Sequence, residues 1–216
     1  MLNYFKFVVL SFFTLLIYYL SQRYLSQAYG SEIEYKLWST RRYGFERTRK
    51  LPKRFFTYTL KEISLWLILP VLVAILSNGG LYFVPILSSL IVIKPLYRLG
   101  KQYKFLSEFE EAKISLAGPI SSILLAILIK GFNITPLEDL VFVSSIIAIS
   151  YMAPLPGLDG LKIFFGSRLL YTFSLIFILV CAFLLNFVTG FVALGIALLF
   201  ALIALCIHFR LFVKAN

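Results

Sequence analysis

The residue best suited to do chemistry in this chain is Asp159, which lies in the stretch Met152-Ala-Pro-Leu-Pro-Gly-Leu-Asp-Gly160. A carboxylate in such an apolar setting is costly unless it is paired or hydrated, so it marks a candidate cation or metal site. A catalytic zinc site needs three protein ligands, chiefly nitrogen or sulfur, and one water. The single histidine of the sequence is His208, near the C-terminal end. Asp159 alone therefore does not predict zinc chemistry.

A structural role for Asp159 is the alternative interpretation. Aspartate is a preferred N-cap residue, and a helix is expected to begin near Leu161. Lys162 follows closely and supplies an opposite charge. Pro154 and Pro156 would then serve only to end the preceding apolar segment. The sequence leaves both interpretations open.

The composition is typical of a membrane protein. Of 216 residues, 60% are hydrophobic and 14% are charged, whereas soluble domains contain about 25% charged residues. Uncharged apolar runs cover residues 7–20, 63–93, 114–129, 140–158 and 169–207. With about 20 residues per span, they predict an all-α polytopic membrane protein with about six transmembrane helices. The last run suits two helices joined by a turn at 186–190. Pro85 argues against a helix around 81–95, where we expect a small β or re-entrant element.

The distribution of charge predicts the orientation. The net charge is +11, and all of the 21 lysines and arginines except Lys6 and Lys130 lie on one side if the second apolar run enters and returns. The positive-inside rule makes that side cytoplasmic. We expect one domain in the cell membrane, 1–216, with a basic interfacial segment at 21–62, a cytoplasmic loop at 94–113 and a cytoplasmic C-terminus. The basic charge then meets the headgroups of the lipid bilayer rather than nucleic acid.

Three local patterns occur in a fixed order along the chain. They are Leu16-Ile-Tyr-Tyr-Leu-Ser-Gln-Arg-Tyr-Leu-Ser-Gln-Ala-Tyr-Gly30 at the end of a span, Leu116-Ala-Gly-Pro-Ile-Ser-Ser122 at the start of another, and Pro154-Leu-Pro-Gly-Leu-Asp-Gly160 at the end of a third. This order resembles the site-2 protease family of intramembrane zinc metalloproteases. The resemblance covers most of the chain, although the strongest motif of the family is missing.

In that family, one helix carries the motif H-E-x-x-H. Its two histidines share a helix face and bind one zinc ion, and its glutamate activates the attacking water. Aligned on Gly30, the resemblance places the ligand positions at Tyr18 and Gln22 and the base position at Tyr19. Neutral tyrosine and glutamine are poor zinc ligands, and Tyr19 cannot replace a carboxylate base. We therefore expect no catalytic residue at these degenerate positions.

The other two motifs match the family better. Asp159 matches the aspartate that completes the zinc site, so it would be a metal ligand only if a metal is bound. Ser122 and Tyr151 stand where the family often has asparagine. The resemblance implies five candidates for substrate binding, namely Gly118, Pro119, Ser122, Pro154 and Pro156.

Three functional hypotheses follow. The first is a proteolytically inactive relative of the site-2 proteases, without a cofactor, that binds transmembrane helices of other membrane proteins or regulates a membrane complex. The second is an active intramembrane protease with zinc, its further ligands coming from elsewhere. The third is a small transport or accessory subunit without proteolytic ancestry, which predicts that Tyr18, Gln22 and Asp159 lie far apart.

Overall fold

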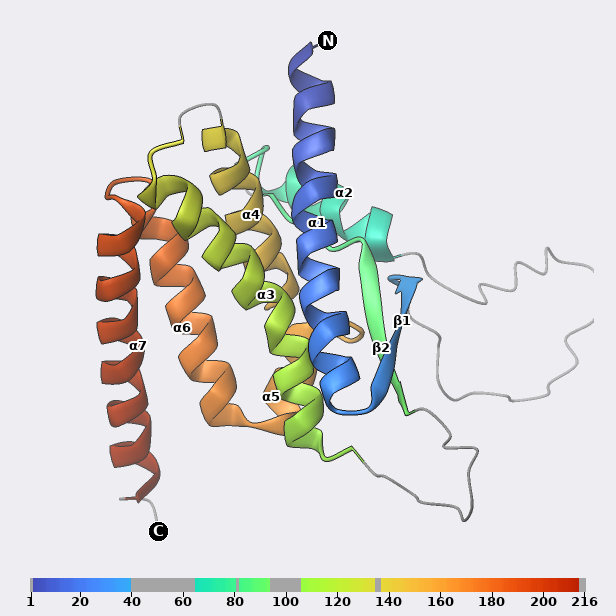
Figure 1. Ribbon diagram of the computed structural model, residues 1–216, viewed down its shortest axis with the longest axis vertical. Helices are drawn as coiled ribbons and strands as arrows, with labels where there is room; N and C mark the ends of the chain where they lie inside the picture. The colour runs from blue at the N-terminus through green and yellow to red at the C-terminus, as the bar shows by residue number, and fades with distance from the viewer. Residues whose placement is uncertain (1, 40–64, 81, 94–105, 135–136, 214–216) are drawn as a thin grey trace, which may run out of the picture.

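The computed structural model describes residues 2–39, 65–80, 82–93, 106–134 and 137–213. Within these residues the chain forms seven helices and one two-stranded sheet (Figure 1). In chain order, the elements are α1 (Leu2–Ala28), β1 (Ser31–Leu37), α2 (Leu65–Leu76), β2 (Leu87–Ile93), α3 (Glu108–Gly131), α4 (Glu138–Tyr151), α5 (Asp159–Gly166), α6 (Arg168–Leu184) and α7 (Gly190–Val213).

Three helices of the described residues are long and apolar enough to cross a membrane, not six. They comprise Lys6–Ala28 of α1, the whole of α3, and Gly190–Arg210 of α7. The predicted number is too high because turns shorten the other helices below the length of about 20 residues that a span requires. Helix α2 has 12 residues and α4 has 14. Asn78 and Gly79 take positive φ angles directly after α2, and Pro154 follows α4 closely.

The predicted β element around 81–95 is present. Strand β2 pairs antiparallel with β1, from Ser31 opposite Ile93 to Leu37 opposite Leu87. Strand β1 lies inside the predicted interfacial segment 21–62, whose first residues continue α1 to Ala28. Residues 40–64 of that segment lie outside the described part of the chain, as do residues 94–105 of the predicted loop 94–113.

Helix α3 is the centre of the bundle and packs against α1, α4, α5, α6 and α7 (Figure 1). It begins at Glu108, inside the predicted loop 94–113, because Ser107 and Glu110 form a capping box at its first turn. Glycines allow close approach at both ends of the bundle. A Cβ on Gly166 would lie 2.3 Å from the Glu108 carbonyl oxygen, and one on Gly190 would lie 2.2 Å from the Ile127 carbonyl oxygen.

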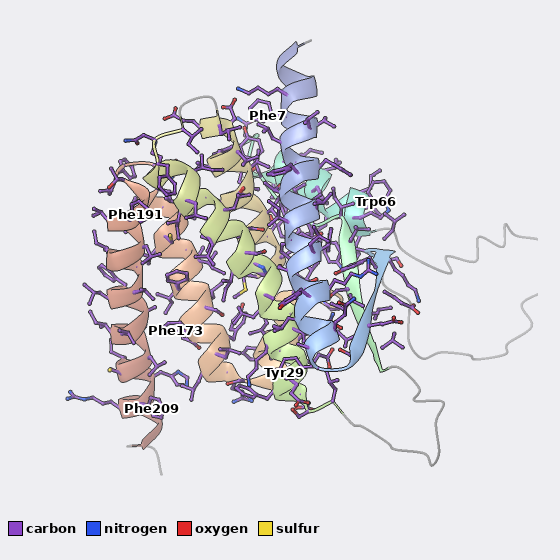
Figure 2. The ribbon with its side chains drawn as sticks, viewed as in Figure 1. Phe7, Tyr29, Trp66, Phe173, Phe191 and Phe209 are labelled. Carbon is purple, nitrogen blue, oxygen red and sulfur yellow. The ribbon has the colours of Figure 1, made fainter. Side chains whose placement is uncertain are left out.

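Helix α7 has one face buried against the bundle and another face exposed. Ala193, Ala197 and Ala201 are fully buried, and their four-residue spacing forms one face toward the bundle. Phe191 and Phe209 are about half exposed and project from the helix (Figure 2). The turn between α6 and α7 falls at the predicted position, 186–190. Exposed apolar side chains of this kind suit contact with lipid.

Candidate functional site

The candidate site is a buried hydrogen-bonded cluster around Asp159, the first residue of α5. Asp159 is 1% exposed. Its Oδ2 atom accepts hydrogen bonds from the Tyr18 hydroxyl at 2.5 Å and from the Gln22 amide nitrogen at 2.7 Å. Its Oδ1 atom accepts a hydrogen bond from the Ser89 hydroxyl at 2.5 Å. Three elements that are distant in sequence, α1, β2 and α5, therefore meet at one carboxylate.

Helix α1 brings two of these donors together because Tyr18 and Gln22 are one turn apart. Residues separated by four positions share a helix face, and both side chains are fully buried. These are the two positions that the resemblance assigns to zinc ligands. The third hypothesis required them to lie far from Asp159, and that geometric prediction is wrong.

Gly118 of α3 makes room for Tyr18. A Cβ on Gly118 would lie 2.4 Å from the Tyr18 ring, well inside van der Waals contact. Pro119 and Ser122, the next two predicted substrate-binding residues, are buried in the same helix. The Gly-Pro motif therefore sets the position of the aromatic ring whose hydroxyl reaches Asp159.

Asp159 does not cap the helix that it begins. The N-cap residue of α5 is Leu158, and no side chain caps it. The predicted cap is wrong because the carboxylate turns toward Tyr18, Gln22 and Ser89 instead of toward its own backbone. Gly160 is required beside it, since a Cβ there would lie 2.2 Å from the Met152 carbonyl oxygen.

Lys162 balances the charge of the carboxylate. Its ammonium nitrogen is 3.6 Å from Oδ1 of Asp159, and the lysine side chain is 16% exposed. The same nitrogen donates to the backbone oxygen of Ser89 and, at 2.6 Å, to the Ser89 hydroxyl. Lys162 thus ties α5 to β2. The sequence indicated this cation by its spacing from Asp159, but no local signal indicated Ser89.

Tyr19, which stands at the position of the family's catalytic base, takes part in hydrogen bonds that hold the fold together. The hydroxyls of Tyr19 and Tyr151 lie 2.5 Å apart in a hydrogen bond. The Tyr151 oxygen accepts two hydrogen bonds from backbone N–H groups, one from Ile86 at 3.3 Å and one from Leu87 at 3.1 Å. The Tyr35 hydroxyl donates to the Tyr19 carbonyl oxygen at 3.0 Å, and burial raises the pKa of Tyr35. Tyr19 and Tyr151 thus join the start of β2 to α1 and α4, and Tyr35 joins β1 to α1.

The remaining predicted residues lie at the edge of the site. Pro154 and Pro156 are exposed in the connection between α4 and α5. The carbonyl oxygen of Pro156 accepts a hydrogen bond of 2.7 Å from the Trp38 indole nitrogen. Gly157 follows with a φ of +90°, and a Cβ there would lie 2.9 Å from the same nitrogen. His208 lies in the last turns of α7.

Comparison with protein-family models, with curated proteins and with solved structures finds no match. The site is therefore interpreted from its own chemistry.

The residues at the site do not fit a zinc ion. Zinc ligands direct lone pairs toward the metal, whereas the Tyr18 hydroxyl and the Gln22 amide both direct hydrogens at Asp159. Lys162 places a positive charge beside the one carboxylate. Among the residues that the structure describes, no three His, Cys, Asp or Glu side chains form a potential metal-binding group.

Proposed function

We propose that this chain is a proteolytically inactive relative of the site-2 proteases, which acts in the membrane by binding transmembrane helices or regulating a membrane complex. One observation carries the proposal. Tyr18 and Gln22, at the two ligand positions of the missing motif, both donate hydrogen bonds to the same oxygen of Asp159, Oδ2. The chain retains the arrangement of three motifs around one point while lacking the nitrogen ligands.

The contacts of the neighbouring motif support this proposal. Gly118 belongs to the second motif, and its missing side chain admits the Tyr18 ring. Tyr19 and Tyr151, at the positions of the family's glutamate and asparagine, bind each other. A neutral tyrosine pair cannot activate a water molecule as a glutamate does. Tyr18, Tyr19, Gln22 and Tyr151 thus each have a hydrogen-bond partner within the site, which favours a stable scaffold over a damaged active site.

Because the buried cluster around Asp159 is closed by its own hydrogen bonds, the function must be carried by the outer surface of the bundle. Exposed apolar side chains, such as Phe183 and Phe200, project from α6 and α7. In a bilayer such surfaces contact lipid or other transmembrane helices through close packing. A proteolytically inactive scaffold acts through these contacts.

Charge supports a cytoplasmic position for the basic loops and the C-terminus. The ion pairs Lys6–Asp139, at 2.7 Å, and Lys130–Glu138, at 3.5 Å, hold the only two cations that the predicted orientation places outside. The N-terminus of α1 and the C-terminus of α7 lie at opposite ends of the bundle (Figure 1). The predicted orientation, which rests on the positive-inside rule, requires these two ends to lie on opposite sides of the membrane.

Metal content and proteolysis together test the proposal. Purified protein should contain no stoichiometric zinc, and a helical reporter co-expressed with it should remain intact. The matched control is Asp159→Ala, which should change neither result. Stoichiometric zinc that disappears in Asp159→Ala, or reporter cleavage that this substitution abolishes, would instead establish the active zinc protease.

A further inference from the structure

Four buried side-chain oxygens lack a hydrogen-bond partner among the described residues. They are Oε1 of Gln22 and the hydroxyls of Ser115, Ser122 and Ser144. Each of the four residues is at most 1% exposed. An unsatisfied buried polar group costs about 1–3 kcal/mol, so four of them in one helical bundle require an explanation.

Hydrogen bonds within their own helices do not account for the three serine hydroxyls. Serine in an apolar helix usually donates to a carbonyl oxygen of the preceding turn. Ser121, Ser145 and Ser174 do so, with bonds of 2.7 to 2.8 Å to Gly118, Val141 and Leu170. Ser115, Ser122 and Ser144 do not. Their hydroxyls are therefore free to bind something other than their own helix.

The four residues lie on the packed helices α1, α3 and α4, and we group them into two pairs, Gln22 with Ser115 and Ser122 with Ser144. The Gln22 amide donates to the Ser115 carbonyl oxygen at 3.2 Å, so Gln22 and Ser115 are neighbours beside Asp159. Ser122 and Ser144 lie on the packed, antiparallel helices α3 and α4, nine residues before the end of α3 and six residues after the start of α4. The Tyr18 ring, packed on Gly118, lies between the levels of the two pairs on α3.

We propose that each pair binds an internal water molecule. Hydroxyls both donate and accept, which suits water, and a buried water typically makes about three hydrogen bonds to groups that otherwise lack partners. A cation is a poorer ligand because Lys162 already balances Asp159. The water of the Gln22–Ser115 pair, the lower water, lies beside the Asp159 cluster. The Tyr18 ring separates it from the upper water, which Ser122 and Ser144 bind.

The water sites give the bundle a polar interior beneath an apolar exterior. On α1 the buried polar residues Thr14, Tyr18, Gln22 and Ser26 follow one another at four-residue spacing, so they form one inner stripe. The upper water connects α3 to α4 through Ser122 and Ser144. The lower water connects α1 to α3 through Gln22 and Ser115.

Thermal unfolding of the purified full chain tests this proposal. Ser122→Ala and Ser144→Ala each remove a partner of the upper water, and each should lower the melting temperature by about 2–4 °C. Without a bound water, these substitutions would remove an unsatisfied hydroxyl. An unchanged or raised melting temperature would therefore overturn the proposal. Ser145→Ala is the matched control, because it makes the same substitution in α4 but removes a hydroxyl that already bonds to its own helix.

A high-resolution experimental structure provides the second measurement and does not depend on the variants. It should show oxygen-sized density within hydrogen-bonding distance of both Ser122 and Ser144, and again between Gln22 and Ser115. Ordered side chains at these positions without such density would also overturn the proposal. Both outcomes are independent of whether the chain is a protease relative.

Discussion

The Tyr18 hydroxyl donates a 2.5 Å hydrogen bond to Asp159 across 141 positions of sequence. This bond joins α1 to the start of α5, and both residues are buried. A hydrogen bond to a charged partner contributes about 1.5–3 kcal/mol, more than one between neutral groups. The Tyr18–Asp159 contact is therefore a structural centre of the fold as well as the residue pair on which the functional proposal rests.

Tyr18→Phe tests that contact with the smallest change. The ring and its packing on Gly118 remain, but Asp159 loses a donor. We expect a loss of about 1.5–3 kcal/mol in the free energy of unfolding, measured by thermal or denaturant unfolding in detergent. Tyr24→Phe is the control, because Tyr24 lies on the same helix and is 78% exposed. Equal stability of the two variants would contradict the role given to the bond.

Asp159→Asn tests the charge balance at the site. The substitution leaves the Lys162 ammonium group without its carboxylate partner. Breaking a buried ion pair from one side destabilises a protein by about 3–5 kcal/mol. The double variant Asp159→Asn/Lys162→Met removes both charges and should regain part of the loss. An additive result in this double-mutant cycle would show that the two charges do not interact.

Gly118→Ala tests the fit of the Tyr18 ring against α3. The added methyl group would lie 2.4 Å from the ring, and overpacking of this kind costs about 1–3 kcal/mol. Gly195→Ala is the control, because a Cβ there meets nothing within 4 Å. That control should be neutral or stabilising, since alanine favours helix over glycine. Unfolding measurements that rank Gly118→Ala as the more stable of the two variants would refute the packing argument.

The sequence predicted part of the fold, and its errors have physical causes. The α6–α7 turn and strand β2 were predicted because length limits and Pro85 give local signals. Six spans were expected because apolar composition does not reveal where a helix ends. Strand β1 was missed since its partner, β2, is distant in sequence. The start of α3 has a local signal in the sequence, the capping box of Ser107 and Glu110.

The site was predicted less completely. The resemblance identified Tyr18, Gln22 and Asp159, and these three residues do meet. The N-cap prediction failed because propensity describes local backbone bonding, whereas tertiary donors compete for the same carboxylate. Ser89 was not found, since a serine in an apolar strand resembles many others until the fold brings it to Lys162 and Asp159.

Reconstituting the missing motif tests the resemblance itself. Tyr18→His, Tyr19→Glu and Gln22→His, combined with Lys162→Met, restore H-E-x-x-H and remove the competing cation. Since Tyr18 and Gln22 both reach one oxygen of Asp159, histidines there should direct two nitrogens to a metal beside that carboxylate. We expect about one zinc per chain by elemental analysis, lost when Asp159→Ala is added.

The control for this variant keeps the spacing and changes the helix face. Tyr19→His and Arg23→His are also one turn apart, but the Tyr19 hydroxyl binds Tyr151 rather than Asp159. This pair, again with Lys162→Met, should bind no stoichiometric zinc. Equal zinc content in both variants would mean that histidine spacing alone recruits the metal. Absence of zinc from a folded H-E-x-x-H variant would show that the cluster around Asp159 does not have the geometry of a site-2 protease centre.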